Sequence, residues 1–167
     1  MTHKLFGITG WKNSGKTTMT ERLVECLTGR GYRIATIKHA HHDFDIDHEG
    51  TDSWRHRKAG AAEVAIVSQR RFAIMHENLD APEPSLQEIV ARLSPCDLVL
   101  VEGYKREPHK KIELRRTGGH DGPLLAESDP SIVAIASNYP QAGCSIPVFD
   151  IDAIEAIADF IQKEMSL

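Results

Sequence analysis

Eight consecutive residues near the start of the chain, Gly10 to Thr17, match the pattern G-x-x-x-x-G-K-[ST] at every fixed position. In this pattern the glycines let backbone N–H groups surround phosphate oxygens, the lysine reaches the β and γ phosphates, and the final hydroxyl can bind Mg²⁺. The loop must follow a buried strand and open a helix. Both are predicted, because residues 4–9 form an apolar run and apolar side chains recur at helical spacing from Met19 to Leu27. The residues expected to surround the phosphates of a nucleoside triphosphate are Gly10, Trp11, Lys12, Asn13, Ser14, Gly15, Lys16, Thr17 and Thr18.

Strand-like and helix-like segments alternate through all 167 residues. Continuous apolar runs such as 97–103 are typical of parallel strands that are covered on both faces. Two runs separated only by Gln69 and Arg70 predict a hairpin over residues 63–76. We therefore expect one domain, residues 1–167, with the α/β fold of the P-loop NTPases: a mostly parallel sheet, helices on both faces and an antiparallel hairpin excursion. The predicted strands are 4–9, 33–38, 63–68, 71–76, 97–103, 111–115 and 131–137, and the predicted helices are 16–30, 52–59, one capped by Ser85, and 152–165.

Composition and charge argue against several other classes of protein. The formal net charge of −4 disfavours a nucleic-acid-binding domain, which is normally basic. No run approaches the roughly 18 apolar residues of a membrane span and no signal peptide is evident, so we expect a cytoplasmic protein that binds neither membrane nor nucleic acid. The cysteines Cys26, Cys96 and Cys144 form no C-x-x-C pair and predict no zinc site. The basic stretch 105–116 fits an anionic ligand or a solvated strand about equally well.

A carboxylate, Glu102, ends the apolar strand predicted at 97–103. In open α/β sheets ligands bind outside the carboxyl ends of the strands, and a carboxylate beside the phosphate loop can hold Mg²⁺ or polarise water. Asp97 begins the same strand and so belongs to the opposite end. We therefore predict Glu102 as the Mg²⁺ carboxylate, with a strand-terminal surface residue as the alternative.

Histidines and carboxylates are dense in the tract 39–53. His39, His41, His42 and His48 could bind a transition metal, for which imidazole is a suitable ligand. The aspartates, Asp47 among them, could instead complete an Mg²⁺ shell around the phosphates, as a loop that senses the γ-phosphate does. A solvated loop is the third interpretation, and the switch-like loop is the one we favour.

The chain as a whole resembles the molybdopterin-guanine dinucleotide biosynthesis protein B family. The resemblance rests on the phosphate loop followed by a specific series of short motifs. These are Lys38-His39, His41-His42-Asp43, Asp45-x-Asp47, Gly50, Asp52-Ser53, Arg57-Lys58-Ala59-Gly60-Ala61, Ser68-Gln69 and Leu100-Val101-Glu102-Gly103-Tyr104-Lys105. The resemblance implies a homodimeric GTP-binding protein with a slow Mg²⁺-dependent GTPase activity. It would act as an adaptor beside the guanylyltransferase that joins GMP to molybdopterin, with molybdopterin as a further candidate ligand.

The resemblance also implies roles for individual residues. The loop from Gly10 to Thr18 would bind the phosphates, with Lys16, Glu102 and Asp47 as the catalytic set. Thr17, Glu102 and Asp47 would serve Mg²⁺. No arginine finger is identifiable, and because a missing one reduces the rate by about 10³ to 10⁵, slow hydrolysis is expected.

Two positions depart from patterns seen in related proteins. Phosphate-loop proteins that dimerise across the nucleotide often carry a lysine directly after the first loop glycine, where this chain has Trp11 and only then Lys12. The second position is the expected base site at Asn138, which follows the strand 131–137 without a clear Asx-Lys-x-Asp motif. An asparagine can hydrogen-bond any purine, so the expectation of GTP comes from the resemblance.

Two other functions fit the same loop. The first is a metal-inserting GTPase that uses the histidines of the 39–53 tract, and the second is a P-loop small-molecule kinase, for which no lid segment is evident. The apolar run 72–75 is either a core strand or a strand at a dimer interface.

Overall fold

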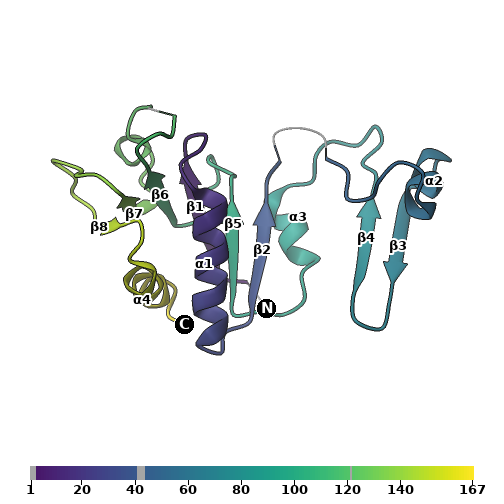
Figure 1. Ribbon diagram of the computed structural model, residues 1–167, viewed down its shortest axis with the longest axis horizontal. Coiled ribbons are helices and arrows are strands. Elements are labelled where there is room, and N and C mark those ends of the chain that lie inside the picture. Colours follow the sequence, from purple (N-terminus) through teal and green to yellow (C-terminus); the bar gives the residue numbers. More distant parts are fainter. Residues whose placement is uncertain (1–2, 41–43, 121) are drawn as a thin grey trace. The chain divides into compact units, whose positions relative to one another are not determined.

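Six parallel strands form the sheet at the centre of the first of two structural units, in the order β2-β5-β1-β6-β7-β8 (Figure 1). The computed structural model describes residues 3–40, 44–120 and 122–167. The first unit lies within residues 1–39 and 90–167, and the second comprises residues 40–89. The strands of the first unit are β1 (Leu5–Gly10), β2 (Ile34–Lys38), β5 (Leu98–Glu102), β6 (Lys111–Arg115), β7 (Ile132–Ser137) and β8 (Val148–Asp150).

Two long helices, α1 (Lys16–Gly29) and α4 (Ile154–Met165), pack against each other on one face of this sheet (Figure 1). Each helix carries an apolar stripe at spacings of three and four residues, which is the condition for burying one side of a helix. Alternate residues of the strands point to this face and complete the core. The core side chains with at most 3% exposure are Phe6, Ile8, Met19, Leu23, Leu27, Leu98, Leu100, Ile112, Leu114, Ala134, Ala136, Ile157, Ala158 and Ile161.

The opposite face of β6 is polar and yet fully buried. The Nζ of Lys111 donates to the carbonyl of Glu107 and lies 3.2 Å from Oδ2 of Asp129. Glu113 accepts hydrogen bonds from backbone N–H groups at the start of the short helix η1 (Leu125–Glu127). Where the sequence predicts a second helical layer, the connecting segments therefore cover β6, and they satisfy the polar groups that they bury.

The second unit contains the predicted hairpin of β3 (Glu63–Val67) and β4 (Phe72–His76) together with α2 (Asp52–Lys58). The strands are antiparallel, with Val67 opposite Phe72. The hairpin excursion is therefore confirmed, as is the parallel sheet of the first unit.

The helix α3 (Leu86–Ala91) spans the boundary between the two units. It begins with the predicted capping box, in which the N–H of Glu88 donates to the Ser85 hydroxyl and the N–H of Ser85 donates to the Glu88 carboxylate. Because two units can still fold together, the single domain over residues 1–167 stays a prediction. Within the described ranges, no helix is both long and apolar enough to cross a membrane.

Candidate functional site

The phosphate loop connects β1 to α1, as the motif predicts. Gly10 has φ 145° and Gly15, immediately before the helix, has φ 92°, both in the region that favours glycine. The first helical residue is Lys16, so the free N–H groups of the helix N-terminus lie at the end of the loop. A helix N-terminus with these N–H groups and the positive end of the dipole is suited to bind phosphate.

Lys16 is folded back onto its own loop. Its Nζ donates to the carbonyls of Trp11 at 2.8 Å and Gly10 at 3.2 Å. Burial lowers the pKa of Lys16, and the positive charge of Lys105 lowers it further. Glu102 raises this pKa and Lys38 lowers it. The ammonium of Lys16 therefore lies in a region where positive charge exceeds negative charge, which favours an anionic ligand.

Glu102 lies at the carboxyl end of β5, between the ends of β1 and β2 in the sheet. It is 9% exposed. The Thr17 hydroxyl lies 3.3 Å from Oε1 of Glu102, and Nζ of Lys38 lies 3.6 Å from the same oxygen. Asp97 is at the other end of the strand, where it accepts a hydrogen bond from the N–H of Arg33. The structure thus brings together Thr17 and Glu102, two of the three residues predicted to serve Mg²⁺.

The residues around Glu102 fit a nucleotide bound with Mg²⁺. A hydroxyl and a carboxylate are oxygen ligands of the kind that Mg²⁺ prefers. The three nearby lysines outnumber the single carboxylate, so this edge of the sheet carries uncompensated positive charge. Triphosphate oxygens would neutralise that charge.

Asp47, the third predicted Mg²⁺ residue, belongs to the second unit. Its carboxylate accepts a hydrogen bond from Arg57 at 2.6 Å, and Arg57 also binds Asp45 and Glu77. The hydrogen bond from Arg57 holds the pKa of Asp47 below its usual value. Asp47 is therefore ionised and engaged within its own unit, and its role at Mg²⁺ stays a prediction.

The predicted metal-binding histidines are only partly described. His41 and His42 lie outside the described residues. The ring of His39 packs on that of Tyr104, with centroids 4.6 Å apart, and His48 is exposed. Among the residues that the structure does describe, no three histidine, cysteine or carboxylate side chains are grouped to hold a metal ion.

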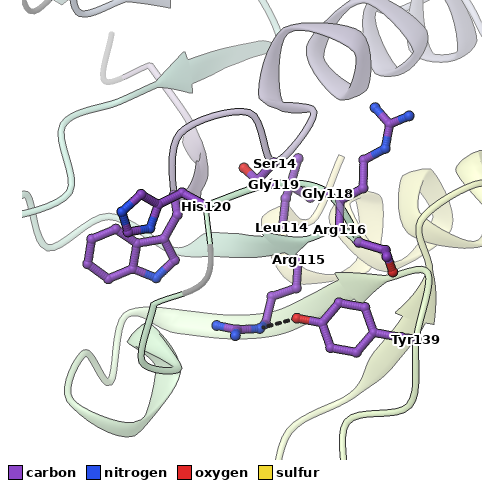
Figure 2. Close-up of a pocket in the computed structure, with 10 residues that line it drawn as sticks. Ser14, Leu114, Arg115, Arg116, Gly118, Gly119, His120 and Tyr139 are labelled. Atoms are coloured by element: carbon purple, nitrogen blue, oxygen red, sulfur yellow. Dashed lines mark hydrogen bonds between the residues drawn. The ribbon is translucent and has the colours of Figure 1, made fainter.

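A cavity of about 310 Å³ lies beside the phosphate loop, at the end of β6; we call it the β6 cavity (Figure 2). Its floor is fixed by Arg115, which points toward Tyr139 and donates to the phenol oxygen at 3.0 Å. The Ser14 hydroxyl is buried, and none of the described residues forms a hydrogen bond with it. The lining residues are Trp11, Ser14, Leu114, Arg115, Arg116, Thr117, Gly118, Gly119, His120 and Tyr139.

A second cavity, of about 210 Å³, contains the predicted base-contacting residue Asn138; we call it the β7 cavity. The Oδ1 of Asn138 accepts the N–H of Thr117 at 2.9 Å, which fixes the orientation of the amide. The carboxylate of Asp152 is in the same cavity and is paired with Arg22 at 2.6 Å. The lining residues are Gly15, Thr18, Met19, Arg22, Arg116, Asn138, Ile151 and Asp152.

Sequence reasoning does not identify Asp152 as a site residue, and it includes Arg116 only as the last residue of the basic stretch 105–116. Asp152 follows β8, which is only three residues long and has no recognisable periodicity. Arg116 lines both cavities because it directly follows β6. The available signal is positional, since residues that directly follow parallel strands gather at the ligand-binding edge of the sheet.

Comparisons with known proteins agree with this geometry. The family model for Molybdopterin guanine dinucleotide synthesis protein B matches residues 5–138. The chain is 40% identical over 163 residues to the Molybdopterin-guanine dinucleotide biosynthesis adapter protein of Escherichia coli (strain K12), covering 96% of this chain and 93% of the relative. The protein of the same name from Haemophilus influenzae (strain ATCC 51907 / DSM 11121 / KW20 / Rd) is 42% identical over 162 residues, covering 95% and 88%.

Solved structures give the same result for the fold. A crystal structure of molybdopterin-guanine biosynthesis protein B superposes with a TM-score of 0.74 at 28% identity, covering 96% of this chain and 99% of that one. The predicted α/β class is therefore confirmed both by the strand order of the sheet and by the similarity to a solved structure. Sequence, fold and phosphate loop agree, and the chain belongs to the molybdopterin guanine dinucleotide synthesis protein B family.

Proposed function

We propose that the chain is a GTP-binding adapter in molybdopterin-guanine dinucleotide biosynthesis and that it hydrolyses GTP slowly with Mg²⁺. The observation that carries this proposal is the meeting of the phosphate loop with Glu102, whose carboxylate lies 3.3 Å from the Thr17 hydroxyl. The adapter role is supported by the names of the relatives from Escherichia coli and Haemophilus influenzae.

In this proposal the loop N–H groups and Lys16 hold the phosphates, and Thr17 with Glu102 holds Mg²⁺. The metal would neutralise charge on the β and γ phosphates. The positive groups whose charges act on Lys16 are two lysines, Lys105 and Lys38. An arginine that stabilises the transition state accelerates such reactions by about 10³ to 10⁵. Neither of the positive charges that act on Lys16 is an arginine, which supports slow turnover.

Guanine is favoured over adenine by the charge in the β7 cavity. Asp152 places a carboxylate in the same cavity as Asn138. A carboxylate only accepts hydrogen bonds, and guanine offers two neighbouring donors, at N1 and N2, where adenine has an acceptor at N1. Asp152 would therefore select the base, and Asn138 would add a contact to the purine.

Homodimer formation is the second part of the proposed adapter role, and the hairpin of the second unit supports it. Val67, Phe72 and Ile74 lie on one face of the two strands, and they are 74%, 71% and 60% exposed. Exposed apolar residues that gather on one surface often mark a protein interface. The run 72–75, predicted as a core or interface strand, contributes only Met75 to the buried side. A second copy of the chain is our proposed occupant, and the guanylyltransferase would bind elsewhere on the dimer.

Competition binding tests the nucleotide part of the proposal. Wild type, Lys16→Ala and Asp152→Asn are titrated with a fluorescent GTP analogue and competed with GTP, ATP or molybdopterin. We expect wild type to prefer GTP, Lys16→Ala to bind both nucleotides about tenfold more weakly, and Asp152→Asn to lose the preference for GTP over ATP. Equal affinity of wild type and Lys16→Ala for GTP would refute the assignment of the loop.

Association is measured separately by light scattering on a sizing column. Wild type should elute as a dimer, and Phe72→Asp should shift it to a monomer that still binds GTP. A monomeric wild type would refute the proposed interface. With purified guanylyltransferase and GTP added, the chain should co-elute with the transferase, and Lys16→Ala should reduce the co-eluting fraction. Co-elution that does not depend on nucleotide would mean that the adapter role does not require GTP binding.

A further inference from the structure

Trp11, the second residue of the phosphate loop, holds two lysines through two different groups. Its backbone carbonyl accepts a hydrogen bond from Nζ of Lys16 at 2.8 Å. The Nζ of Lys105 lies over its ring, 4.6 Å from the centroid. A cation over a tryptophan face within about 6 Å is attracted by the ring quadrupole. One residue of the loop therefore organises the ammonium groups of Lys16 and Lys105.

The indole ring of Trp11 is itself fixed in position. Its Nε1 donates to the carbonyl of Pro123 at 2.9 Å, and the ring stacks on His120 with centroids 5.6 Å apart. A Cβ added to Gly122 would lie 2.4 Å from the indole, so the backbone closely approaches the ring. The ring is a fixed platform, and Lys105 is held on it.

A strained turn brings Lys105 to that platform. The two residues after Glu102 both have positive φ angles, 95° at Gly103 and 45° at Tyr104. Positive φ at a bulky residue such as tyrosine is unfavourable and persists only where the surroundings impose it. The ring of Tyr104 packs on His39, and Cβ of His39 lies 2.9 Å from where a side chain on Gly103 would begin. The turn thus redirects the chain at the end of β5 and presents Lys105 to the phosphate loop.

Among the ion pairs of the described residues, none joins Lys105 to a carboxylate, so no acidic partner explains its position. In that part of the chain Glu102 is paired with Lys38, and Lys105 contacts an aromatic ring. The charge of Lys105 acts on Lys16, so the two ammonium groups are close enough to repel each other. Holding like charges together is unfavourable without an anion between them.

We propose that Lys105 binds the γ-phosphate of the nucleotide, with Trp11 as its positioning residue. This inference rests on the proposed nucleotide binding and deepens it, because it identifies a residue that distinguishes triphosphate from diphosphate. Lys16 and the loop N–H groups serve both nucleotides. Lys105 follows Glu102 by three residues, and it contacts the terminal phosphate only.

The first test compares two affinities in calorimetry, for GDP and for the non-hydrolysable analogue guanosine 5′-(β,γ-imido)triphosphate, both with Mg²⁺. Lys105→Met should lower the affinity for the analogue by about 10- to 100-fold, the range for loss of a charge-assisted hydrogen bond. Its affinity for GDP should change less than about twofold, because no γ-phosphate is present. Lys105→Arg should restore most of the analogue affinity, since arginine also carries a charge and stacks on tryptophan.

The matched control is Lys110→Met. The Nζ of Lys110 is paired with the carboxylate of Glu164 at 2.8 Å. It is a lysine of the same basic stretch that directly precedes β6, at the amino end of that strand, and both affinities should be unchanged in this variant. A parallel loss in Lys110→Met would show that general positive charge, and not a γ-phosphate contact, is responsible.

The second test uses Trp11 as the reporter. The chain has two tryptophans, and Trp54 belongs to the second unit, so Trp54→Phe leaves Trp11 as the only one. The analogue should draw Lys105 off the ring and change the emission of Trp11, while GDP should produce a smaller change. Adding Lys105→Met should remove the difference between the two nucleotides.

The outcomes separate this inference from the proposed function. If wild type binds neither nucleotide, nucleotide binding itself is wrong. If wild type binds both and Lys105→Met binds both equally well, with unaltered Trp11 emission, only the role of Lys105 is refuted.

Discussion

Gly10→Ala provides a direct test of how tightly the phosphate loop is built into the sheet. A Cβ at this position would lie 2.6 Å from the Ser14 hydroxyl oxygen and 2.7 Å from the carbonyl oxygen of Leu114. Ser14 can rotate away, because none of the described residues hydrogen-bonds its hydroxyl. Leu114 cannot, since it lies on β6 directly opposite Gly10 in the parallel register. The clash must therefore be relieved by moving the loop.

Two contributions determine how much Gly10→Ala lowers the free energy of unfolding. A φ of 145° is accessible to glycine and strains alanine, at a cost of about 1–3 kcal/mol. Overpacking against a fixed backbone costs about 1–3 kcal/mol more. We therefore expect the free energy of unfolding to fall by about 2–6 kcal/mol, out of the roughly 5–15 kcal/mol typical of a folded domain. Displacing the loop N–H groups should also weaken GTP binding by at least about tenfold, if one phosphate hydrogen bond is lost.

Gly29→Ala is the matched control. Gly29 ends α1, and among the described residues no atom outside the neighbouring helix backbone lies within 4 Å of a Cβ added there. Alanine at a helical position should stabilise the protein by about 0.5–1 kcal/mol, because it reduces the entropy of the unfolded chain. Urea unfolding followed by circular dichroism measures both variants, and GTP titration follows binding. A Gly10→Ala protein within about 0.5 kcal/mol of wild type and with normal GTP affinity would refute the close approach of Leu114.

Two further predictions concern the polar face of β6. Glu113→Leu removes a fully buried carboxylate that pairs with Arg115 and accepts from two backbone N–H groups, so urea unfolding should show a loss of about 3–5 kcal/mol. A loss below about 1 kcal/mol would mean that water replaces the carboxylate. The second prediction is a dependence on pH. Burial and the charge of Lys111 lower the pKa of His109 to about 4, below the value of about 6.5 for an unfolded histidine. Stability should be full above pH 6.5 and fall between pH 6.5 and 4, where the unfolded chain binds the extra proton. His109→Leu should flatten that decline in urea titrations, and an unchanged slope would exclude His109 as its source.

The pairing of Thr17 with Glu102 was accessible from sequence for a physical reason. Both residues lie at the carboxyl end of a strand. Thr17 belongs to the loop motif that follows β1, and Glu102 is the last residue of β5. Neighbouring parallel strands place their carboxyl ends at one edge. The strand positions alone therefore predict that the two side chains are close, and in the structure the Thr17 hydroxyl lies 3.3 Å from Oε1 of Glu102.

The buried face of β6 could not be predicted in the same way. The segment 111–115 alternates charged and apolar residues, which is typical of a strand with one solvated face. Lys111 and Glu113 are instead fully buried, because residues 125–131 fold over them and supply hydrogen-bond partners. Those partners lie 12 to 20 residues further along the chain. No local pattern encodes a contact of that separation.

The Trp11 ring is held by contacts between residues that are still further apart in the sequence. The indole reaches Pro123, which is 112 residues away, and Lys105 returns to it from the end of β5. From sequence, Trp11 marked only a departure from a lysine that related loops carry. The structure places the ammonium of Lys105, which follows β5, over the ring of Trp11.

The same contacts set the expected loss for Lys16→Ala. Nζ of Lys16 has two carbonyl acceptors, on Trp11 and Gly10, which it must exchange for phosphate oxygens on binding a nucleotide. An ammonium–phosphate contact has charge on both partners, whereas the ammonium–carbonyl contacts have charge only on the donor. The exchange is therefore favourable, but it gains less free energy than a phosphate contact made by a water-exposed lysine. We therefore expect a loss near the lower end of about 10- to 100-fold for one charge-assisted contact. The loss of GTP affinity caused by Lys16→Ala should be the same in a Trp11→Gly background if only the backbone carbonyl of Trp11 positions Lys16. A reduced effect in the double variant would mean that the indole, through Lys105, contributes to the position of Lys16.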